Sequence, residues 1–207
     1  MIEQWICGFV GEGSSDNALT GPLEALLRRI CPGDDVSVRP HSWLDEKQKP
    51  GKTVSGRLKD LENAGYDLCF YHRDADDPQG MNSRLFEFAS VSAPDWIVPV
   101  IPVVETETWA MAALWDDKVF STWIRDKYSI ASIARLEELH NPKEILRQYL
   151  STYSTSRRRR VFNFSAERKR LLCNLDIGGS IAKFGAWQAL EHRLSEAVSK
   201  RRPYLQR

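Results

Sequence analysis

Acidic residues stand directly after three apolar runs of this chain. Each run reads as a strand buried on both faces, because near-continuous apolar stretches bounded by turn residues are typical of parallel sheets. In open α/β sheets, ligands bind just outside the carboxyl ends of the strands, so acids that are scattered along the chain can converge there. The acids are, in chain order, Glu12 after the run 5–10, Asp74 and Asp76 after the run 66–71, and Glu105 and Glu107 after the run 96–104.

Carboxylates that converge in this way would repel one another and raise each other's pKa values unless a cation neutralises them. Magnesium prefers hard oxygen ligands, and it usually takes one or two carboxylates while substrate phosphates and water complete its coordination shell. Manganese takes the same kinds of ligand. The spacing therefore predicts a site for magnesium or manganese, with Asp74 and Asp76 as ligands.

The loop 11–16 leaves the first expected strand and opens a helix, a position where backbone N–H groups and the helix dipole favour phosphate. It lacks the Gly-Lys-Ser/Thr of a P-loop and the full G-x-G-x-x-G of dinucleotide-binding proteins. A plain tight turn is therefore the alternative, since glycine is the default residue of such turns. Glu12 favours a functional role, because a carboxylate between two glycines at a strand end can reach a substrate as a base or a metal ligand.

A histidine and an arginine, His72 and Arg73, precede the acidic pair Asp74 and Asp76. The alternative interpretation of this segment is an acidic turn in which an aspartate caps the next helix. The presence of Glu12 at the end of another strand favours the ligand interpretation. In that case Arg73 or His72 would hold a carboxylate in place or contact a substrate phosphate.

The repeated order of strand, loop and helix predicts an α/β fold for the first half of the chain and a mainly helical C-terminal half. Prolines in the run 96–104 favour an edge position or an irregular strand end. The expected strands are 5–10, 36–38, 66–71 and 96–104, and the expected helices are 18–30, 53–64, 83–90, 109–115, 130–139, 141–150 and 180–200.

The length of 207 residues fits one domain, or one domain with an appendage. A net charge of +1 means that binding to nucleic acid would need a local cluster of basic residues. The four cysteines form no C-x-x-C pair, so we expect no structural zinc site and a reducing compartment. The sequence shows no signal peptide and no apolar window near the roughly 20 residues of a membrane span, so we expect a cytoplasmic protein without a membrane partner.

Two basic runs are candidates for contact with a nucleic-acid backbone, because Lys and Arg neutralise phosphates without regard to sequence. A charge run is as often a solvated loop, and that alternative stays open. The runs are Arg157, Arg158, Arg159 and Arg160, and Lys200, Arg201 and Arg202.

Glu12 and Asp16 form an E-G-x-x-D pattern after the first expected strand, and Asp74 and Asp76 form a D-x-D pattern after a later one. Together these patterns resemble the Toprim domain, which is shared by topoisomerases, primases and several small nucleases. The segments 102–109, 116–117, 141–143 and 180–184 extend the likeness. They are similar to a bacterial family of Toprim-like proteins of unknown function, often found beside ATPase partners in phage-defence loci, and this likeness covers nearly the whole chain.

The resemblance implies a Toprim-like core over residues 1–107, with a small parallel sheet flanked by helices, and a helical extension over residues 108–207 packed on that core. It makes Glu12 the general acid or base, Asp74 and Asp76 the magnesium ligands, and Glu107 a further ligand. The chain departs from the family in one respect. Toprim domains commonly have a glycine three residues after the second aspartate, whereas Gly80 stands four residues after Asp76.

The sequence thus leads to the hypothesis of a magnesium-dependent nuclease that hydrolyses phosphodiester bonds of DNA or RNA, with Arg73 and the run 157–160 contacting the nucleic acid. The resemblance adds the expectation that it is the effector of an anti-phage defence system controlled by a partner ATPase. The chain has no room for the further domains that a topoisomerase or a primase needs. The alternatives are a Toprim-like regulatory subunit that docks on an ATPase and cuts nothing, and a nucleotide-binding protein that uses the loop 11–16.

Overall fold

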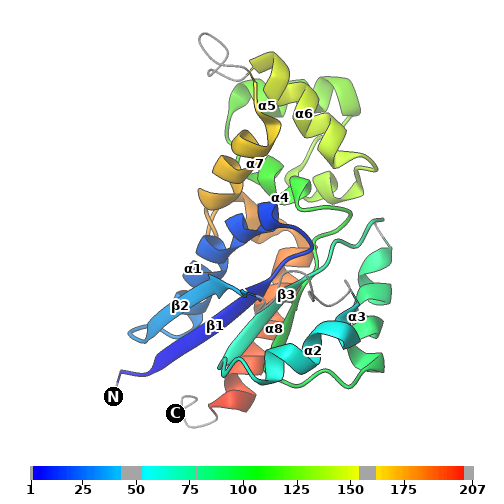
Figure 1. The fold of residues 1–207 in the computed structure, drawn as a ribbon. Coiled ribbons are helices and arrows are strands. Elements are labelled where there is room, and N and C mark those ends of the chain that lie inside the picture. Colours follow the sequence, from blue (N-terminus) through cyan, green and yellow to red (C-terminus); the bar gives the residue numbers. More distant parts are fainter. Residues whose placement is uncertain (1, 43–52, 78, 154–161, 203–207) are drawn as a thin grey trace.

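A four-stranded parallel sheet forms the centre of the protein. The computed structural model describes residues 2–42, 53–77, 79–153 and 162–202, and Figure 1 shows their arrangement. The strand order is β2-β1-β3-β4, and each neighbouring pair is parallel. The strands are β1 (Gln4–Val10), β2 (Asp35–Pro40), β3 (Leu68–His72) and β4 (Ile97–Val100).

Helices cover both faces of the sheet, and alternate strand residues therefore pack into two hydrophobic clusters. Trp5 and Phe9 of β1 pack in the larger cluster with α1 (Thr20–Ile30) and α8 (Gly185–Arg201). Cys69 and Tyr71 of β3 pack in the smaller cluster with two other helices, α2 (Val54–Glu62) and α3 (Gly80–Ser90). All five residues of β3 are buried, as expected of a strand covered on both sides.

The C-terminal half is helical and shares its core with the sheet. Trp109 and Trp187, which belong to opposite ends of this half, meet edge to face with their ring centroids 5.1 Å apart. The larger cluster contains Leu23 of α1 as well as Leu190 of α8, so residues on both sides of position 107 contribute to one core. In Figure 1, α5, α6 and α7 lie above the sheet, and α8 returns alongside it. The remaining helices are α4 (Glu107–Ala112), α5 (Lys118–Tyr128), α6 (Pro142–Tyr153) and α7 (Phe164–Cys173), with short 3-10 helices η1 (Ser14–Leu19), η3 (Ile133–Glu138) and η5 (Ser180–Lys183).

The structure confirms the predicted α/β class, the parallel sheet flanked by helices and the helical C-terminal half. It also confirms the edge position of the fourth strand, but that strand ends at Val100, before the second proline of its apolar run. Two expected helices differ in detail: 130–139 contains a 3-10 helix, and 180–200 is divided into η5 and α8. The sequence analysis missed α5 and α7 altogether.

Among the described helices, none has both the length and the apolar composition that crossing a lipid bilayer requires.

Candidate active site

The loop that carries Asp74 and Asp76 is fixed to the loop that leaves the neighbouring strand β4. Three backbone hydrogen bonds join them, so the pairing of the two strands continues beyond the sheet. The N–H groups of Arg73, Ala75 and Asp76 donate to the carbonyl oxygens of Val100, Pro102 and Val104, at 3.1, 3.3 and 2.9 Å, respectively. The side chain of Asp74 is thereby held at the carboxyl edge of the sheet, as predicted from its position after β3.

Two residues in these joined loops have a left-handed backbone. The φ angle is 66° at Asp76 and 61° at Val104. Aspartate tolerates this region, but a β-branched valine there is a genuine outlier. Such conformations cost on the order of 1–3 kcal/mol each, and they cluster at active sites and ligand-binding loops. The strain at Val104 is therefore an indication, independent of charge, that this edge of the sheet has a function.

Gly80 packs directly against the loop that carries the two aspartates. A Cβ atom at Gly80 would lie 2.0 Å from the carbonyl oxygen of Ala75, so no larger residue fits without displacing the loop. The first residue of α3 thus touches the backbone between the two aspartates.

Two arginines connect the more exposed acids in a row. The Nε atom of Arg73 lies 2.8 Å from Oε1 of Glu12, and its Nη1 atom lies 3.0 Å from Oε2 of Glu87. Arg84 pairs with the other oxygen of Glu87 and with Oδ2 of Asp76. Glu12 and Asp76 thus belong to one ion-pair network, in which Asp76 is the most exposed acid, with 65% of its side chain accessible.

A second network is buried beneath the first. Both nitrogens of the fully buried His72 ring face carboxylates: Nδ1 lies 3.5 Å from Asp16, and Nε2 lies 3.2 Å from Asp74. Arg168 from α7 contacts the other oxygen of Asp16 at 3.1 Å and Oε1 of Glu107 at 3.0 Å. His72 and Arg168 together contact three acids, one each from η1, the loop after β3 and α4.

Thr106 completes this buried network. Its backbone N–H donates to Oδ1 of Asp74 at 3.1 Å, and its hydroxyl group contacts Arg168. The hydroxyl group also lies 3.5 Å from Oε2 of Glu107. Both oxygens of Glu107 are consequently engaged, and its side chain is only 6% exposed.

The charges in the buried network follow from burial and from these partners. Burial alone would lower the pKa of His72, but the carboxylates of Asp16 and Asp74 raise it to about 9, so the ring is an imidazolium at neutral pH. Burial would raise the pKa of Asp16, but His72, the Gly13 N–H and Arg168 lower it well below its ordinary value. Burial raises the pKa of Glu107, and Arg168 opposes that shift only in part.

The three acids that the sequence singles out share one property that fits a cation. Glu12, Asp74 and Asp76 each have one carboxylate oxygen fixed by a protein contact. Within the described part of the chain, the second oxygen of each has no hydrogen-bond or ion-pair partner. Carboxylates oriented through one oxygen and open at the other suit magnesium or manganese, which needs only one or two such ligands beside substrate phosphates and water.

The expectation of a cluster of several acids around one ion needs correction. Among residues 2–42, 53–77, 79–153 and 162–202, no three His, Cys, Asp or Glu side chains are placed to hold one metal ion. The reason is that Arg73, Arg84 and Arg168 lie between the acids and neutralise them in pairs. Glu107, whose oxygens contact Arg168 and Thr106, supports the site from below, and its predicted role as a ligand stays a prediction.

Of the two basic runs, only the one at 200–202 lies within the described residues, and it does not meet the acidic edge. Arg157, Arg158, Arg159 and Arg160 lie outside the described residues. At the C-terminus, Lys200 pairs with Asp95, and Arg202 pairs with Glu3 and Asp67 while stacking on Trp5. Because Glu3 precedes β1, this second run lies at the opposite end of the sheet from Glu12. Its Arg202 connects the C-terminal helix to the start of β1.

Sequence reasoning missed Arg84, Glu87 and Arg168 as parts of the site. Arg84 and Glu87 lie on α3 three residues apart, as an ordinary surface ion pair would, so their spacing carried no sign of the D-x-D loop. Arg168 lies on a helix that was not predicted. Asp16 belonged to the E-G-x-x-D pattern but had no assigned role, and the pattern was the signal that could have found it.

Comparison with known proteins does not test the likeness to Toprim domains. The chain matches no protein-family model. Neither a curated protein nor a solved structure is significantly similar to it. The family and the function are therefore proposals that rest on the motifs and on the geometry of the edge.

Proposed function

We propose that this protein is a magnesium- or manganese-dependent nuclease of Toprim type that hydrolyses phosphodiester bonds of DNA or RNA at the acidic edge of its sheet. One observation carries the proposal. Glu12, Asp74 and Asp76 come from two neighbouring loops, and each has one oxygen fixed by the protein and one oxygen without a partner in the described structure. That arrangement orients carboxylates toward a ligand that the chain itself does not provide.

Asp74 and Asp76 would hold the cation, which when bound polarises a phosphate and offsets the charge that develops on it. Glu12 is suited to accept a proton from the attacking water, because its carboxylate is held in one position by Arg73 and remains 26% exposed. Arg73 is itself anchored by Glu87, so its guanidinium is positioned at the same edge, where a phosphate oxygen would also be attracted to it.

The buried network keeps Asp74 in place. His72 and the Thr106 N–H both bind Oδ1 of Asp74, which leaves Oδ2 as the oxygen available to a ligand. Arg168 fixes Asp16 and Glu107 around them. Since Arg168 lies on α7, the helical C-terminal half is part of this site and not only a cover for the sheet.

The regulatory alternative has an observation in its favour. Each of the four predicted site acids already has a cationic partner, so part of their charge is offset without a metal ion, as expected of a subunit that no longer cuts. A role in phage defence and an ATPase partner rest on the sequence motifs alone, and they apply to both alternatives.

The test is to measure nucleic-acid cleavage by variants in which uncharged asparagine replaces one aspartate, a change that should preserve the fold. Asp76→Asn suits the left-handed backbone at this position, which asparagine tolerates better than alanine. Asp74→Asn retains the oxygen that accepts from Thr106. Asp77→Asn is the matched control, because Asp77 is exposed, stands next to the motif and contacts the N–H of Gln79 instead of an arginine.

Single-stranded DNA, duplex DNA and RNA would be incubated with each variant in magnesium, in manganese and in EDTA. The proposal predicts metal-dependent cleavage by the wild type and by Asp77→Asn, and a loss of at least a hundredfold in Asp74→Asn and Asp76→Asn. Equal behaviour of all four proteins on every substrate would leave the regulatory alternative.

A further inference from the structure

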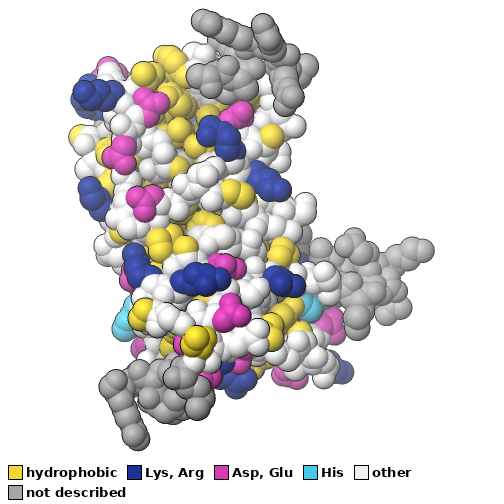
Figure 2. Space-filling model, turned by 90° about the vertical axis from the view of Figure 1, so that its left-hand side faces the viewer, with side chains coloured by type: hydrophobic (Ala, Val, Ile, Leu, Met, Phe, Trp, Pro, Cys, Tyr) yellow, Lys and Arg dark blue, Asp and Glu magenta, His cyan; other side chains and the backbone are white. Residues whose placement is uncertain are grey.

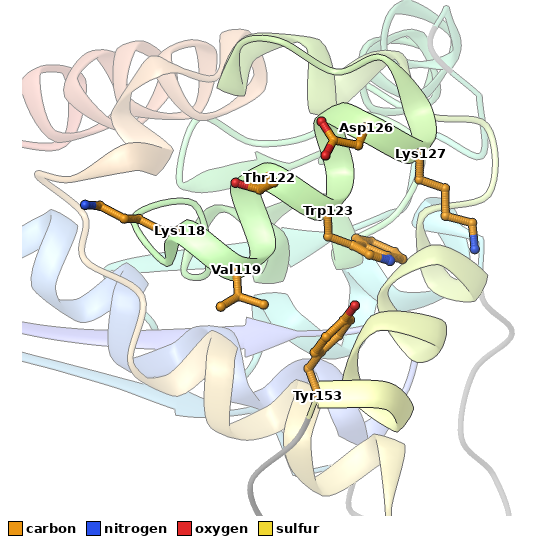
Figure 3. Close-up of a pocket in the computed structure, with 7 residues that line it drawn as sticks. All are labelled: Lys118, Val119, Thr122, Trp123, Asp126, Lys127 and Tyr153. Atoms are coloured by element: carbon orange, nitrogen blue, oxygen red, sulfur yellow. The ribbon is translucent and has the colours of Figure 1, made fainter.

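An open groove of about 730 Å³ lies in the helical half, between α5 and the end of α6. It takes no part in the acidic edge. Figure 3 shows that Trp123 and Tyr153 lie next to each other in the groove, with Lys118 and Lys127 at its two ends. In Figure 2, hydrophobic side chains gather in the upper part of the face that is shown, which is the helical half, with basic and acidic side chains around them.

Neighbouring tyrosine rings pack against the aromatic rings that line the groove. The Trp123 ring lies 5.2 Å from the ring of Tyr149 and 5.4 Å from that of Tyr128, measured between centroids. Tyr149 also packs against Tyr153, with their centroids 5.0 Å apart. Tyr153 is nevertheless 45% exposed. A supported ring with an open side is the geometry that stacking with a flat ligand requires.

The charged groups around these rings favour an anion. Of the three charged residues that line the groove, two are lysines, and the acid, Asp126, is paired with Arg125 at 3.1 Å. The Lys127 ammonium group lies 5.6 Å from the centroid of the Trp123 ring.

We infer that this groove binds single-stranded nucleic acid, with unpaired bases stacked on Tyr153 and Trp123 and the phosphates near Lys118 and Lys127. This inference rests on the proposed nuclease function, because it names the form of the substrate. Aromatic side chains beside a basic groove are the usual means of binding single strands without regard to sequence, and bases inside a duplex cannot reach them. A protein partner fits less well, since lysine is depleted in protein interfaces.

The groove is close enough to the acidic edge for one strand to occupy both. From Glu107 to Ala112 the chain is helical and rises about 8 Å, and the six further steps to Lys118 add at most about 22 Å. The backbone of Lys118 is therefore within about 30 Å of that of Glu107. At the helical rise of about 3.4 Å per nucleotide, roughly nine nucleotides span this distance.

The experiment measures binding separately from cleavage. Fluorescence anisotropy with a labelled 20-nucleotide DNA strand, and with the same strand in a duplex, would be recorded in EDTA on the full chain. Tyr153→Ala removes the exposed ring, and Tyr153→Phe keeps it. Lys127→Glu has a matched control in Lys59→Glu, which reverses an exposed charge on α2, a helix of the other face of the sheet.

We expect the wild type to bind the single strand more tightly than the duplex. Tyr153→Ala should raise the Kd for the single strand about fivefold to a hundredfold, which is the loss of one stacked base, while Tyr153→Phe stays near the wild type. Lys127→Glu should weaken binding and reduce the salt dependence of log K by about one, whereas Lys59→Glu should not.

An unchanged Kd in Tyr153→Ala would overturn the inference and assign the groove to a protein partner. So would equal affinity of the wild type for single strand and duplex. If the wild type binds as expected but cleaves nothing in magnesium, the groove assignment stands and the nuclease proposal fails.

Discussion

Replacing Arg168 by methionine tests whether the helical half holds the acidic edge together. Methionine keeps much of the side-chain length and the helix propensity, so the change removes mainly the charge. Arg168, Asp16 and Glu107 are each less than 8% exposed at the side chain, and the variant would leave the buried Glu107 without its cation and Asp16 with His72 alone. Removing one partner of a buried pair costs about 3–5 kcal/mol. With an m-value near 2 kcal/mol/M, the urea midpoint should fall by about 2 M.

The loss of stability in Arg168→Met should increase as pH rises. Burial already raises the pKa of Glu107 beside Arg168, and without Arg168 that pKa must rise further. A folded-state pKa above the unfolded value means that the folded state binds the proton more tightly, so the variant loses stability as pH rises through the folded pKa. The difference between wild type and variant should thus be larger at pH 8 than at pH 5.

Arg170→Met is the control on the same helix. Arg170 is 59% exposed and pairs only with Glu167 three residues away, so its removal should cost less than about 1 kcal/mol. Urea unfolding followed by circular dichroism measures both variants. Equal midpoints for Arg168→Met and Arg170→Met would refute the reasoning, because Arg168 would then contribute no more than a surface charge.

Three further outcomes follow from single contacts. The pKa of His72 is raised from 6.5 to about 9, so its imidazolium contributes stability that is present below pH 6.5 and lost as pH rises through 9. Urea unfolding in EDTA should therefore show that the free energy of unfolding falls by about 2 kcal/mol between pH 6.5 and 8.5. This loss should be absent in His72→Gln. Gly80→Ala should destabilise the protein by about 1–3 kcal/mol in the same assay and reduce cleavage, because its Cβ would collide with the Ala75 carbonyl, and unchanged values would contradict that contact. Asp117→Ala removes the N-cap that accepts from the Val119 N–H of α5 at 2.8 Å, so thermal unfolding should show a loss of about 1 kcal/mol, and no loss would mean that solvent replaces the cap.

The sheet was predictable because its two central strands, β1 and β3, are largely buried. Near-continuous apolar runs led to β1 and β3, and the prolines of the fourth run predicted the edge position of β4. The acids at the carboxyl edge followed from the same logic, since the end of each parallel strand fixes where the next loop begins.

The two missed helices have few apolar residues that face inward. In α5 the buried residues are Phe120 and Ile124, and in α7 they are Leu171, Leu172 and the charged Arg168. An arginine on the inward side of a helix breaks the hydrophobic period by which a helix is recognised. Arg168, which completes the buried network, is thus also the reason that α7 was not predicted from the sequence.

The pairing of the acids could not be predicted for a related reason. The sequence showed that carboxylates would gather at one edge, but not that cations from α3 and α7 would neutralise them in pairs. Which guanidinium reaches which carboxylate depends on side-chain directions and helix packing, and neither leaves a period in the sequence.

We propose that Asp74 and Asp76 hold a divalent cation at the edge of the sheet. Titration with Mn²⁺ followed by electron paramagnetic resonance measures that binding directly and needs no substrate. We expect one bound Mn²⁺ per chain in the wild type and in Asp77→Asn, and excess Mg²⁺ should displace it. We expect no bound Mn²⁺ in the Asp74→Asn, Asp76→Asn double variant. Equal binding of Mn²⁺ by the wild type and the double variant, or no binding by either, would contradict the claim.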